Sequence, residues 1–298
     1  EAFRWVHGEA DGLPGIIADL YGDVLSLQVS AAGWYRHIDK VAAVFRKVRK
    51  LSAIVLRNET KHLEKEGIPK EVKPLFGEMP KELIKIKMGS IYELVDIEKG
   101  QKTGAYLDVR GVPDMISPLF KGARVLDCFS YQGHFGLHAL ASGASEVVAI
   151  EQSQSAIDIA QKNLEINHLP KKMEWKCGNA FDIMRRMDSD RERFDLVVMD
   201  PPPFSPAKGQ VGSARRGYKE LAVRGFNRIK DGGHMVFLSC SHAFSREMLL
   251  SVLNDAATDA CVSCRIALEI HQPFDHPALS SVPETDYLKG FVLGVRDQ

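Results

Sequence analysis

The 298-residue sequence predicts an α/β protein, with a Rossmann-like, mostly parallel sheet preceded by a smaller α+β domain. From Arg124 onwards, short apolar runs of strand length alternate with amphipathic stretches of helix length, as in repeated strand–helix–strand units. Before residue 98 the pattern differs, because short alternating runs surround a single helical stretch. We therefore expect two domains, residues 1–97 and residues 98–298.

Composition narrows the class of protein. Hydrophobic residues make up 45% and charged residues 26%, which is ordinary globular usage, and no apolar run approaches the roughly 18 residues that cross a bilayer. Lys plus Arg and Asp plus Glu both total 39, so no global basic field indicates a nucleic-acid partner. The five cysteines are too few for a secreted disulfide framework. Cys261 and Cys264 lack a second pair that would complete a zinc site. We expect a cytoplasmic protein without a membrane segment or a metal.

The first domain contains recognisable strands and one helix. Asp23–Val29 alternates apolar and polar residues as a half-buried strand does, and Ala53–Leu56 is a second strand. Apolar residues at helical spacing predict a helix over Ile38–Val48. Ile68–Pro80 is rich in proline, glycine and charge, which predicts a loop, and Leu83–Val95 resumes strand-like alternation.

The second domain alternates strands with helices. The predicted strands are Arg124–Phe129, Glu146–Ile150, Met173–Lys176, Asp195–Met199, Met235–Ser239 and Tyr287–Val295. Ser153 is a suitable N-cap for the second helix, and Gly232-Gly233 would stop the third. The predicted helices are Phe135–Ser142, Gln154–Asn167, Arg216–Ile229 and Ser245–Ala257.

Ligands of such sheets bind outside the carboxyl ends of the strands, near the point where the strand order reverses. The first strand is followed by a glycine-containing turn, Asp127–Gly136, whose spacing is not the G-x-G-x-x-G of a dinucleotide site. Glu151 ends the next strand, about 18 residues after Gly133, where a carboxylate can accept both hydroxyls of a ribose. These features favour an adenosine-containing ligand without a pyrophosphate.

The later strand ends carry further candidates. Asn179 could place its amide against an adenine amino group, with Phe181 beside the ring, or belong to an ordinary polar loop. Asp200 precedes three prolines that lock the backbone, which favours a held carboxylate over a purely structural turn. Cysteines that leave buried strands are usually inert, but Cys240 ends the strand expected beside that of Asp200. Together they would supply a nucleophile and an acid across one pocket.

With these residues, the sequence resembles the class I S-adenosylmethionine-dependent methyltransferases of the ribosomal large-subunit RNA cytosine-5 methyltransferase I type, essentially over its whole length. The motifs that carry the resemblance are Asp127-x-Phe-x-Tyr-x-Gly133, Glu151, Asp200-Pro-Pro-x-Phe204, Arg216-Gly-Tyr218, Ser239-Cys-Ser241, Gln101-Lys-Thr-Gly104, Glu9-Ala-Asp-Gly-Leu-Pro-Gly15, Asp275-His-Pro277 and Tyr287-Leu-Lys-Gly-Phe291. Two features depart from the family. We expect the small RNA-binding PUA domain with which members usually begin to be missing here, and Pro203 stands where they have lysine.

The resemblance implies a seven-stranded class I methyltransferase sheet, with residues 1–97 forming a domain on the substrate side. It implies S-adenosyl-L-methionine as the cofactor. The residues expected to bind it are Gln101, Lys102, Thr103, Asp127, Ser130, Gln132, Gly133, Glu151, Gln152, Asn179, Ala180 and Asp200.

The implied substrate is RNA, as a single-stranded or extruded base of ribosomal RNA. Cytosine C5 has no lone pair, so the family chemistry needs a thiolate that adds to C6, which assigns Cys240 as nucleophile and Asp200 to the base edge. Phe204 and Tyr218 would stack on the base, and Arg216 would contact phosphate. Tyr106 is a further stacking candidate. Each of these aromatic side chains could equally be a core residue, and a homodimer is left open.

Other functions compete with this one. Asp-Pro-Pro followed by an aromatic residue also resembles the turn of amino-methyltransferases, which act on exocyclic amines and need no thiol. A non-catalytic module that binds S-adenosylmethionine or RNA is a second alternative. A dehydrogenase is disfavoured by the glycine spacing.

Overall fold

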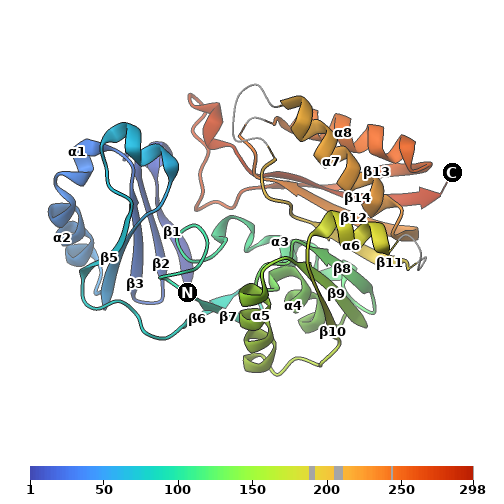
Figure 1. Cartoon of the computed structure of the whole chain (residues 1–298), viewed down its shortest axis with the longest axis horizontal. Helices are drawn as coiled ribbons and strands as arrows, with labels where there is room; N and C mark the ends of the chain where they lie inside the picture. The colour runs from blue at the N-terminus through green and yellow to red at the C-terminus, as the bar shows by residue number, and fades with distance from the viewer. Residues whose placement is uncertain (188–191, 205–210, 243, 298) are drawn as a thin grey trace. The chain divides into compact units, whose positions relative to one another are not determined.

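The computed structural model describes residues 1–187, 192–204, 211–242 and 244–297 (Figure 1). The chain divides into two compact units. Unit 1 comprises Glu1–Met88, Tyr92–Arg110 and Pro273–Thr285, and unit 2 comprises Gly89–Ile91, Gly111–Gln272 and Asp286–Gln298.

This division differs from the boundary between residues 97 and 98 that the sequence suggests, because residues 98–110 and 273–285 belong to unit 1. Thr103 donates a hydrogen bond from Oγ1 to Oδ2 of Asp19, at 2.5 Å, and is also hydrogen-bonded to the hydroxyl of Tyr21. Asp275 accepts a hydrogen bond from the backbone N–H of Arg4 at 2.9 Å. Buried polar groups need hydrogen-bond partners. Here the partners come from segments far apart in the sequence, and the spacing of hydrophobic residues does not show that such segments belong together.

Unit 1 contains a five-stranded sheet, in the order β1-β2-β3-β4-β5. The strands are antiparallel neighbours except β3 and β4, which are parallel and are connected through helices α1 and α2. The elements are β1 (Ala2–His7), β2 (Ile16–Tyr21), β3 (Val24–Val29), α1 (Ala32–Tyr35), α2 (Ile38–Val48), β4 (Ala53–Asn58) and β5 (Glu71–Phe76). Strands β3 and β4 and helix α2 confirm the prediction.

The prediction of a loop over Ile68–Pro80 is wrong, because β5 lies within it. Every residue of β5 is half-buried or exposed, and the strand contains Pro74, which is tolerated at a sheet edge. No apolar run therefore marks β5 in the sequence. The predicted alternation over Leu83–Val95 is confirmed as the hairpin of β6 (Ile84–Met88) and β7 (Ile91–Val95).

Unit 2 contains a seven-stranded sheet, in the order β10-β9-β8-β11-β12-β14-β13. Strand β14 is antiparallel to both of its neighbours, and the other adjacent pairs are parallel. The strands are β8 (Arg124–Cys128), β9 (Glu146–Glu151), β10 (Met173–Cys177), β11 (Phe194–Met199), β12 (Ile229–Ser239), β13 (Val262–His271) and β14 (Lys289–Asp297). This confirms the predicted fold class, although the sequence analysis did not identify the largely exposed edge strand β13.

Helices cover both faces of this sheet (Figure 1). Helices α6 (Ala180–Arg186), α7 (Val211–Phe226) and α8 (Arg246–Asp259) share one apolar core with the strands, and α4 (His134–Ala141) and α5 (Gln154–Ile166) pack on the other face. The predicted N-cap of α5 is confirmed, since Oγ of Ser153 accepts a hydrogen bond from Ala156 N–H. The remaining short turns are α3 (Val112–Met115) and the 3-10 turns Gly8–Asp11, Lys61–Glu66, Leu107–Val109, Ser117–Leu119 and Pro283–Thr285.

The predicted helix Arg216–Ile229 is displaced: α7 spans Val211–Phe226, and Ile229 begins β12. Gly232 and Gly233, expected to stop the helix, lie inside β12, where its register against β11 shifts. A Cβ atom on Gly233 would lie 2.8 Å from the carbonyl oxygen of Asp195. The two glycines therefore permit an irregular strand to approach its neighbour closely.

The chain leaves β8 toward β9 and β10, and later returns to β11 on the other side of β8. The carboxyl ends of these parallel strands share one edge, so the loops after β8, β9, β10, β11 and β12 surround the switch point. Over the described ranges of the chain, helices with the length and apolarity to cross a bilayer are absent.

Candidate cofactor and catalytic site

The turn after β8 has a strained backbone. Phe129 and Tyr131 have φ values of 63° and 48°, in the left-handed region that costs a non-glycine residue about 1–2 kcal/mol. Gly133, with φ of 84°, forms the N-cap of α4. Hydrogen bonds hold the turn, from Ser130 N–H to the carbonyl of Ile150 at 3.0 Å and from Gly133 N–H to the carbonyl of Ser130 at 2.7 Å. Strain retained in this way is typical of binding sites.

Glu151, at the end of β9, is fixed by this turn. Its Oε2 accepts a hydrogen bond from Tyr131 N–H at 2.9 Å, and its Oε1 accepts one from Ser153 N–H at 2.8 Å. Each carboxylate oxygen has a second lone pair. Glu151 therefore offers two further acceptor positions with a fixed orientation, as the adjacent hydroxyls of a ribose require.

Asp127 is a buried carboxyl at the end of β8. Its Oδ2 accepts a hydrogen bond from Gly136 N–H at 2.9 Å, whereas its Oδ1 has no hydrogen-bond partner within the described residues. Burial raises the pKa of Asp127 to about 7, and the charges of Asp200 and Glu151 add to this rise. The hydroxyl of Ser130, also buried, likewise lacks a hydrogen-bond partner in the described part of the chain. Buried polar atoms left in this state suit a polar, positively charged ligand.

The loop after β10 uses Asn179 differently from the expectation. Its Oδ1 accepts hydrogen bonds from Phe181 N–H and Asp182 N–H, so Asn179 is the N-cap of α6. Because the oxygen is occupied, the group that remains is the Nδ2 donor, which suits an adenine ring nitrogen better than an amino group. Ala180 begins α6 and is buried.

Two further predicted cofactor residues flank the turn. Gln132 is buried and donates from Nε2 to the hydroxyl of Tyr131 at 3.2 Å. Gln152, which follows Glu151, is exposed. Each is adjacent in sequence to a residue whose backbone N–H holds Glu151, and their assignment to the cofactor stays a prediction.

Asp200 and Cys240 follow β11 and β12, which are adjacent in the sheet, and both are half-buried. Burial raises the pKa of the Tyr218 hydroxyl to about 12, and Cys240 and Asp200 both add to that rise. The thiol and the carboxyl therefore both belong to the electrostatic surroundings of one hydroxyl group. Since Asp200 also acts on Asp127, one edge of the sheet carries all of these groups.

Tyr218 is itself fully buried, so the structure corrects its expected role as a stacking platform. Its hydroxyl accepts a hydrogen bond from Oγ of Ser239 at 3.0 Å and another from the backbone N–H of Phe204. Its ring packs edge-on against Phe204, with centroids 4.8 Å apart. Through these two hydrogen bonds, Tyr218 fixes the end of the strand before Cys240 and the segment after Asp200. The ring of Phe204 is half-buried and stays a stacking candidate.

The basic cluster at the start of α7 is largely structural. Arg215 is paired with Asp255 at 2.6 Å and Lys219 with Asp259 at 2.8 Å, which joins α7 to α8. Arg216 is exposed and has no acidic partner in the part of the chain that the structure describes. Only Arg216 of this cluster keeps the character expected of a phosphate contact.

Gln101, Lys102 and Thr103 belong to unit 1, and the structure gives them local partners. Lys102 is paired with the buried Asp108 at 2.5 Å, and Gln101 accepts a hydrogen bond from the Tyr106 hydroxyl. Thr103 is buried through the contacts to Asp19 described above. Their assignment to the cofactor, and the stacking role of Tyr106, stay predictions.

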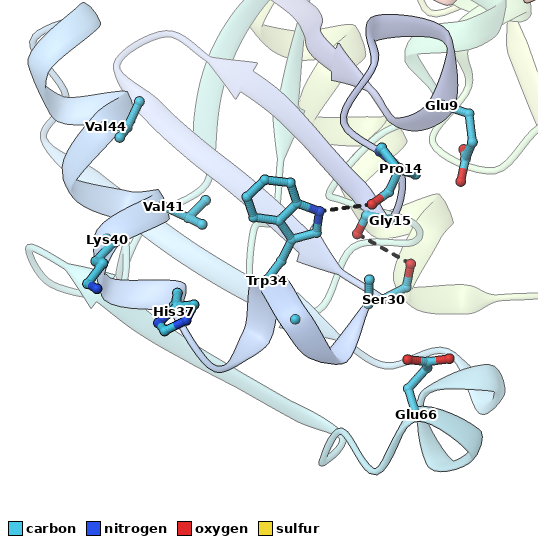
Figure 2. Close-up of a pocket in the computed structure, with 12 residues that line it drawn as sticks. Glu9, Pro14, Gly15, Ser30, Trp34, His37, Lys40, Val41, Val44 and Glu66 are labelled. Atoms are coloured by element: carbon cyan, nitrogen blue, oxygen red, sulfur yellow. Dashed lines mark hydrogen bonds between the residues drawn. The ribbon is translucent and has the colours of Figure 1, made fainter.

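Unit 1 also contains a cavity of about 800 Å³ that the sequence analysis did not identify (Figure 2). The Trp34 ring forms part of its wall, and its indole N–H donates to the carbonyl of Pro14 at 3.0 Å. No residue assigned to the cofactor or to catalysis lines this cavity. The lining of this cavity therefore shares no residue with the proposed methyl-transfer site.

A sheet of this strand order, with carboxylates after its first two strands, defines a class I S-adenosylmethionine-dependent methyltransferase, and comparisons with known proteins agree. The chain is 36% identical over 297 residues to Ribosomal RNA large subunit methyltransferase I from Alteromonas mediterranea, with 99% of this chain and 75% of that protein covered. The protein of the same name from Erwinia tasmaniensis is 36% identical over 296 residues, with 99% and 75% covered. The chain belongs to the ribosomal RNA large subunit methyltransferase I family.

Other comparisons support the fold. Residues 109–211 match the family model described as Conserved hypothetical protein 95. A putative SAM-dependent methyltransferase from Streptococcus mutans has the same fold, with a TM-score of 0.85 at 20% identity, 98% of this chain and 74% of that chain covered. A putative methyltransferase solved in complex with SAH has a TM-score of 0.84 at 20% identity, with 98% and 75% covered.

The residues fit S-adenosylmethionine as cofactor. Bound there, it supplies an electrophilic methyl group on a sulfonium. Glu151 has acceptors for the ribose, and the buried carboxyl of Asp127 and hydroxyl of Ser130 have hydrogen-bonding capacity for the charged methionine part. The strained turn holds these groups in place before binding, which reduces the cost of ordering them.

The ionised carboxyl of the buried Asp127 should lower the stability of the cofactor-free protein at neutral pH. Its pKa is raised from 3.8 to about 7 on folding, so the folded state binds the extra proton between about pH 4 and pH 7, and wild-type stability falls as pH rises through that window. Asp127→Asn removes this cost while keeping an acceptor for Gly136 N–H. We expect the cofactor-free variant to be more stable than wild type above pH 7, by roughly 2–4 kcal/mol.

Urea unfolding at a series of pH values measures this difference. It should shrink as the pH falls and vanish below about pH 4, where both proteins are neutral at this position. A difference that does not depend on pH would show that ionisation of Asp127 is not its cause.

Proposed function

We propose that this protein methylates C5 of a cytosine in large-subunit ribosomal RNA, in the cytoplasm, through a covalent adduct with Cys240. Its relatives of the same family are named ribosomal RNA large subunit methyltransferases. The observation that carries the proposal is that Asp200 and Cys240 directly follow β11 and β12, two paired strands, at the sheet edge where Asp127 and Glu151 lie at the ends of β8 and β9. A thiol beside a carboxyl at the cofactor edge is what C5 chemistry requires and what amine methylation does not.

The proposed steps begin at Cys240. Its thiolate adds to C6 of the cytosine, which makes C5 an enamine-like carbon nucleophile. C5 would then form a bond to the methyl group while the bond from that group to the sulfonium sulfur breaks, with the electron pair of the broken bond left on the sulfur. A base next removes the C5 proton, the C5–C6 double bond re-forms, and the thiolate leaves with the electrons of its bond to C6.

Asp200 would hydrogen-bond the N3 and N4 edge of the cytosine and stabilise the charge that develops there during addition. Its place is held by the prolines that follow it and by Tyr218, which binds the backbone of Phe204. Phe204 would stack on the base, and Arg216 would contact a phosphate. A paired base cannot reach such a pocket, so the target would be single-stranded or extruded from its helix.

The family resemblance also assigns Gln101, Lys102 and Thr103 of unit 1 to the cofactor. Their local contacts support a rigid turn, since Gly104 N–H also donates to the carbonyl of Gln101 at 2.9 Å. A turn held in this way can present Gln101 to a ligand with little loss of entropy.

The test is to incubate the protein with tritiated S-adenosylmethionine and unmodified large-subunit RNA, and then to digest the RNA and identify the labelled nucleoside. We expect label in 5-methylcytidine. Label in an N-methylated nucleoside would replace C5 chemistry with amine methylation, the function that the Asp200-Pro-Pro-x-Phe204 turn would then explain. Cofactor binding without labelled RNA would overturn the substrate assignment.

A further inference from the structure

Lys289 is a buried cation that the steps above do not use. It is the first residue of β14 and lies opposite Ser239 of β12, the residue before Cys240. Only 4% of its surface is exposed, although lysine is almost never fully buried unless it is paired. A lysine at this depth, beside the end of the strand that carries the nucleophile, calls for a reason.

The ammonium is held by backbone carbonyls. Its Nζ donates to the carbonyl of Ser241 at 3.0 Å and to that of Phe244 at 2.7 Å, both in the segment that follows Cys240. Among the described residues, no carboxylate lies within ion-pair distance of it. An ammonium has three N–H groups, and two of them are used by these carbonyls. The positive charge is therefore fixed against the backbone that follows Cys240, and no acidic side chain of the described residues pairs with it directly.

The electrostatic surroundings connect Lys289 with Cys240. Burial lowers the pKa of Lys289, and three negative or ionisable neighbours oppose that fall: Asp286, Cys240 and Glu247. The positive charge of Arg246 lowers the pKa of Lys289 further. Cys240 and Asp200 both raise the pKa of the Tyr218 hydroxyl, so the carboxylate of Asp200 belongs to the same electrostatic surroundings and would disfavour a further negative charge. A thiolate at Cys240 is thus disfavoured by the Asp200 carboxylate and favoured by the Lys289 ammonium.

We propose that Lys289 is a positioning residue that holds the sulfur of Cys240 as a thiolate and orients it through the Ser241 carbonyl. The inference rests on the proposed function, which makes Cys240 the nucleophile. A nearby cation favours the ionised form of a thiol, and the thiolate is the nucleophilic form. The thiol proton passes to solvent before RNA binds, and Lys289 keeps its own proton throughout. The Tyr287-Leu-Lys-Gly-Phe291 motif thereby acquires a function at the active centre.

The rate at which iodoacetamide alkylates Cys240 reports the thiolate fraction without RNA or cofactor. We would measure it by mass spectrometry of the Cys240 peptide from about pH 6 to about pH 10. In the wild type, the midpoint should lie below the ordinary thiol value of about 8.5. Lys289→Met should raise the midpoint by about one pH unit or more, which slows alkylation near pH 7 about tenfold, and Lys289→Arg should restore it. The exposed Cys261 in the same samples serves as an unchanged reference.

Lys289→Gln separates charge from hydrogen bonding, because it keeps donors for the two carbonyls but carries no charge. It should behave like Lys289→Met. The inference is wrong if Lys289→Gln or Lys289→Met titrates as the wild type does. It is also wrong if the midpoint instead follows His242→Ala, since the exposed imidazole of His242 would then be the partner. Melting temperatures of all variants identify any that are misfolded, and only folded variants are compared.

This readout is independent of methyl transfer. A raised midpoint in Lys289→Met together with 5-methylcytidine formation by a Cys240→Ser variant would support the pairing of Lys289 with Cys240 and refute the proposed function. An unchanged midpoint in Lys289→Met, together with 5-methylcytidine formation that requires Cys240, would support the proposed function and refute the pairing of Lys289 with Cys240.

Discussion

Replacing Cys240 by serine should reduce methyl transfer to RNA at least about a thousandfold, with S-adenosylmethionine affinity within about twofold of the wild type. A serine hydroxyl is nearly the same size as the thiol, but at neutral pH almost none of it is ionised, so it cannot add to C6 at a useful rate. The half-buried position makes a large loss of stability unexpected. Initial rates with tritiated cofactor, and calorimetric titration with S-adenosylmethionine in the absence of RNA, measure the two quantities.

Cys261→Ser is the matched control, because it makes the same change at an exposed cysteine between α8 and β13. RNA that contains 5-fluorocytidine gives a second readout. A base can remove the hydrogen at C5 as a proton but cannot remove fluorine in this way, so the enzyme should stay covalently attached to the RNA. Retained turnover of Cys240→Ser, with methyl on a nitrogen, would eliminate the covalent mechanism and leave amine methylation.

Glu151→Gln should weaken S-adenosylmethionine binding about a hundredfold or more. Hydrogen bonds to a charged acceptor contribute about 1.5–3 kcal/mol each, and the ribose would lose two of them. The amide also has only one acceptor oxygen, so one of the N–H groups of Tyr131 and Ser153 would face the NH₂ group instead. The turn after β8 would therefore lose part of its support as well as its ligand contact.

Glu146→Gln makes the same change at the other end of β9, where Glu146 is paired with the partly exposed Arg124. Surface pairs of this kind contribute about 0–1 kcal/mol, so this control should bind the cofactor as the wild type does. Titration calorimetry of both variants with S-adenosylmethionine gives the comparison. Equal affinities for the two would remove Glu151 from the cofactor site.

The sequence predicted most of what positions the site. The strands β8, β9, β11 and β12 are buried apolar runs, and the residues that follow them have to meet at one edge of a parallel sheet. Periodicity failed where strands are exposed at sheet edges, as in β5 and β13, because such strands carry no continuous apolar signal. The prediction that Gly232 and Gly233 end a helix was also wrong. A glycine that ends a helix and one that permits an irregular strand look alike in sequence.

By itself, then, the amino-acid sequence determined the class of sheet, the order of the candidate residues along it and the chemistry of each side chain. Tertiary structure alone decided which of these side chains are available to ligands and which are not. Asn179 uses its oxygen to cap α6, Tyr218 is buried behind Phe204, and Lys289 reaches the segment after Cys240 from β14. The physical reason is that burial and hydrogen-bond partners depend on contacts between distant segments, which local spacing does not encode.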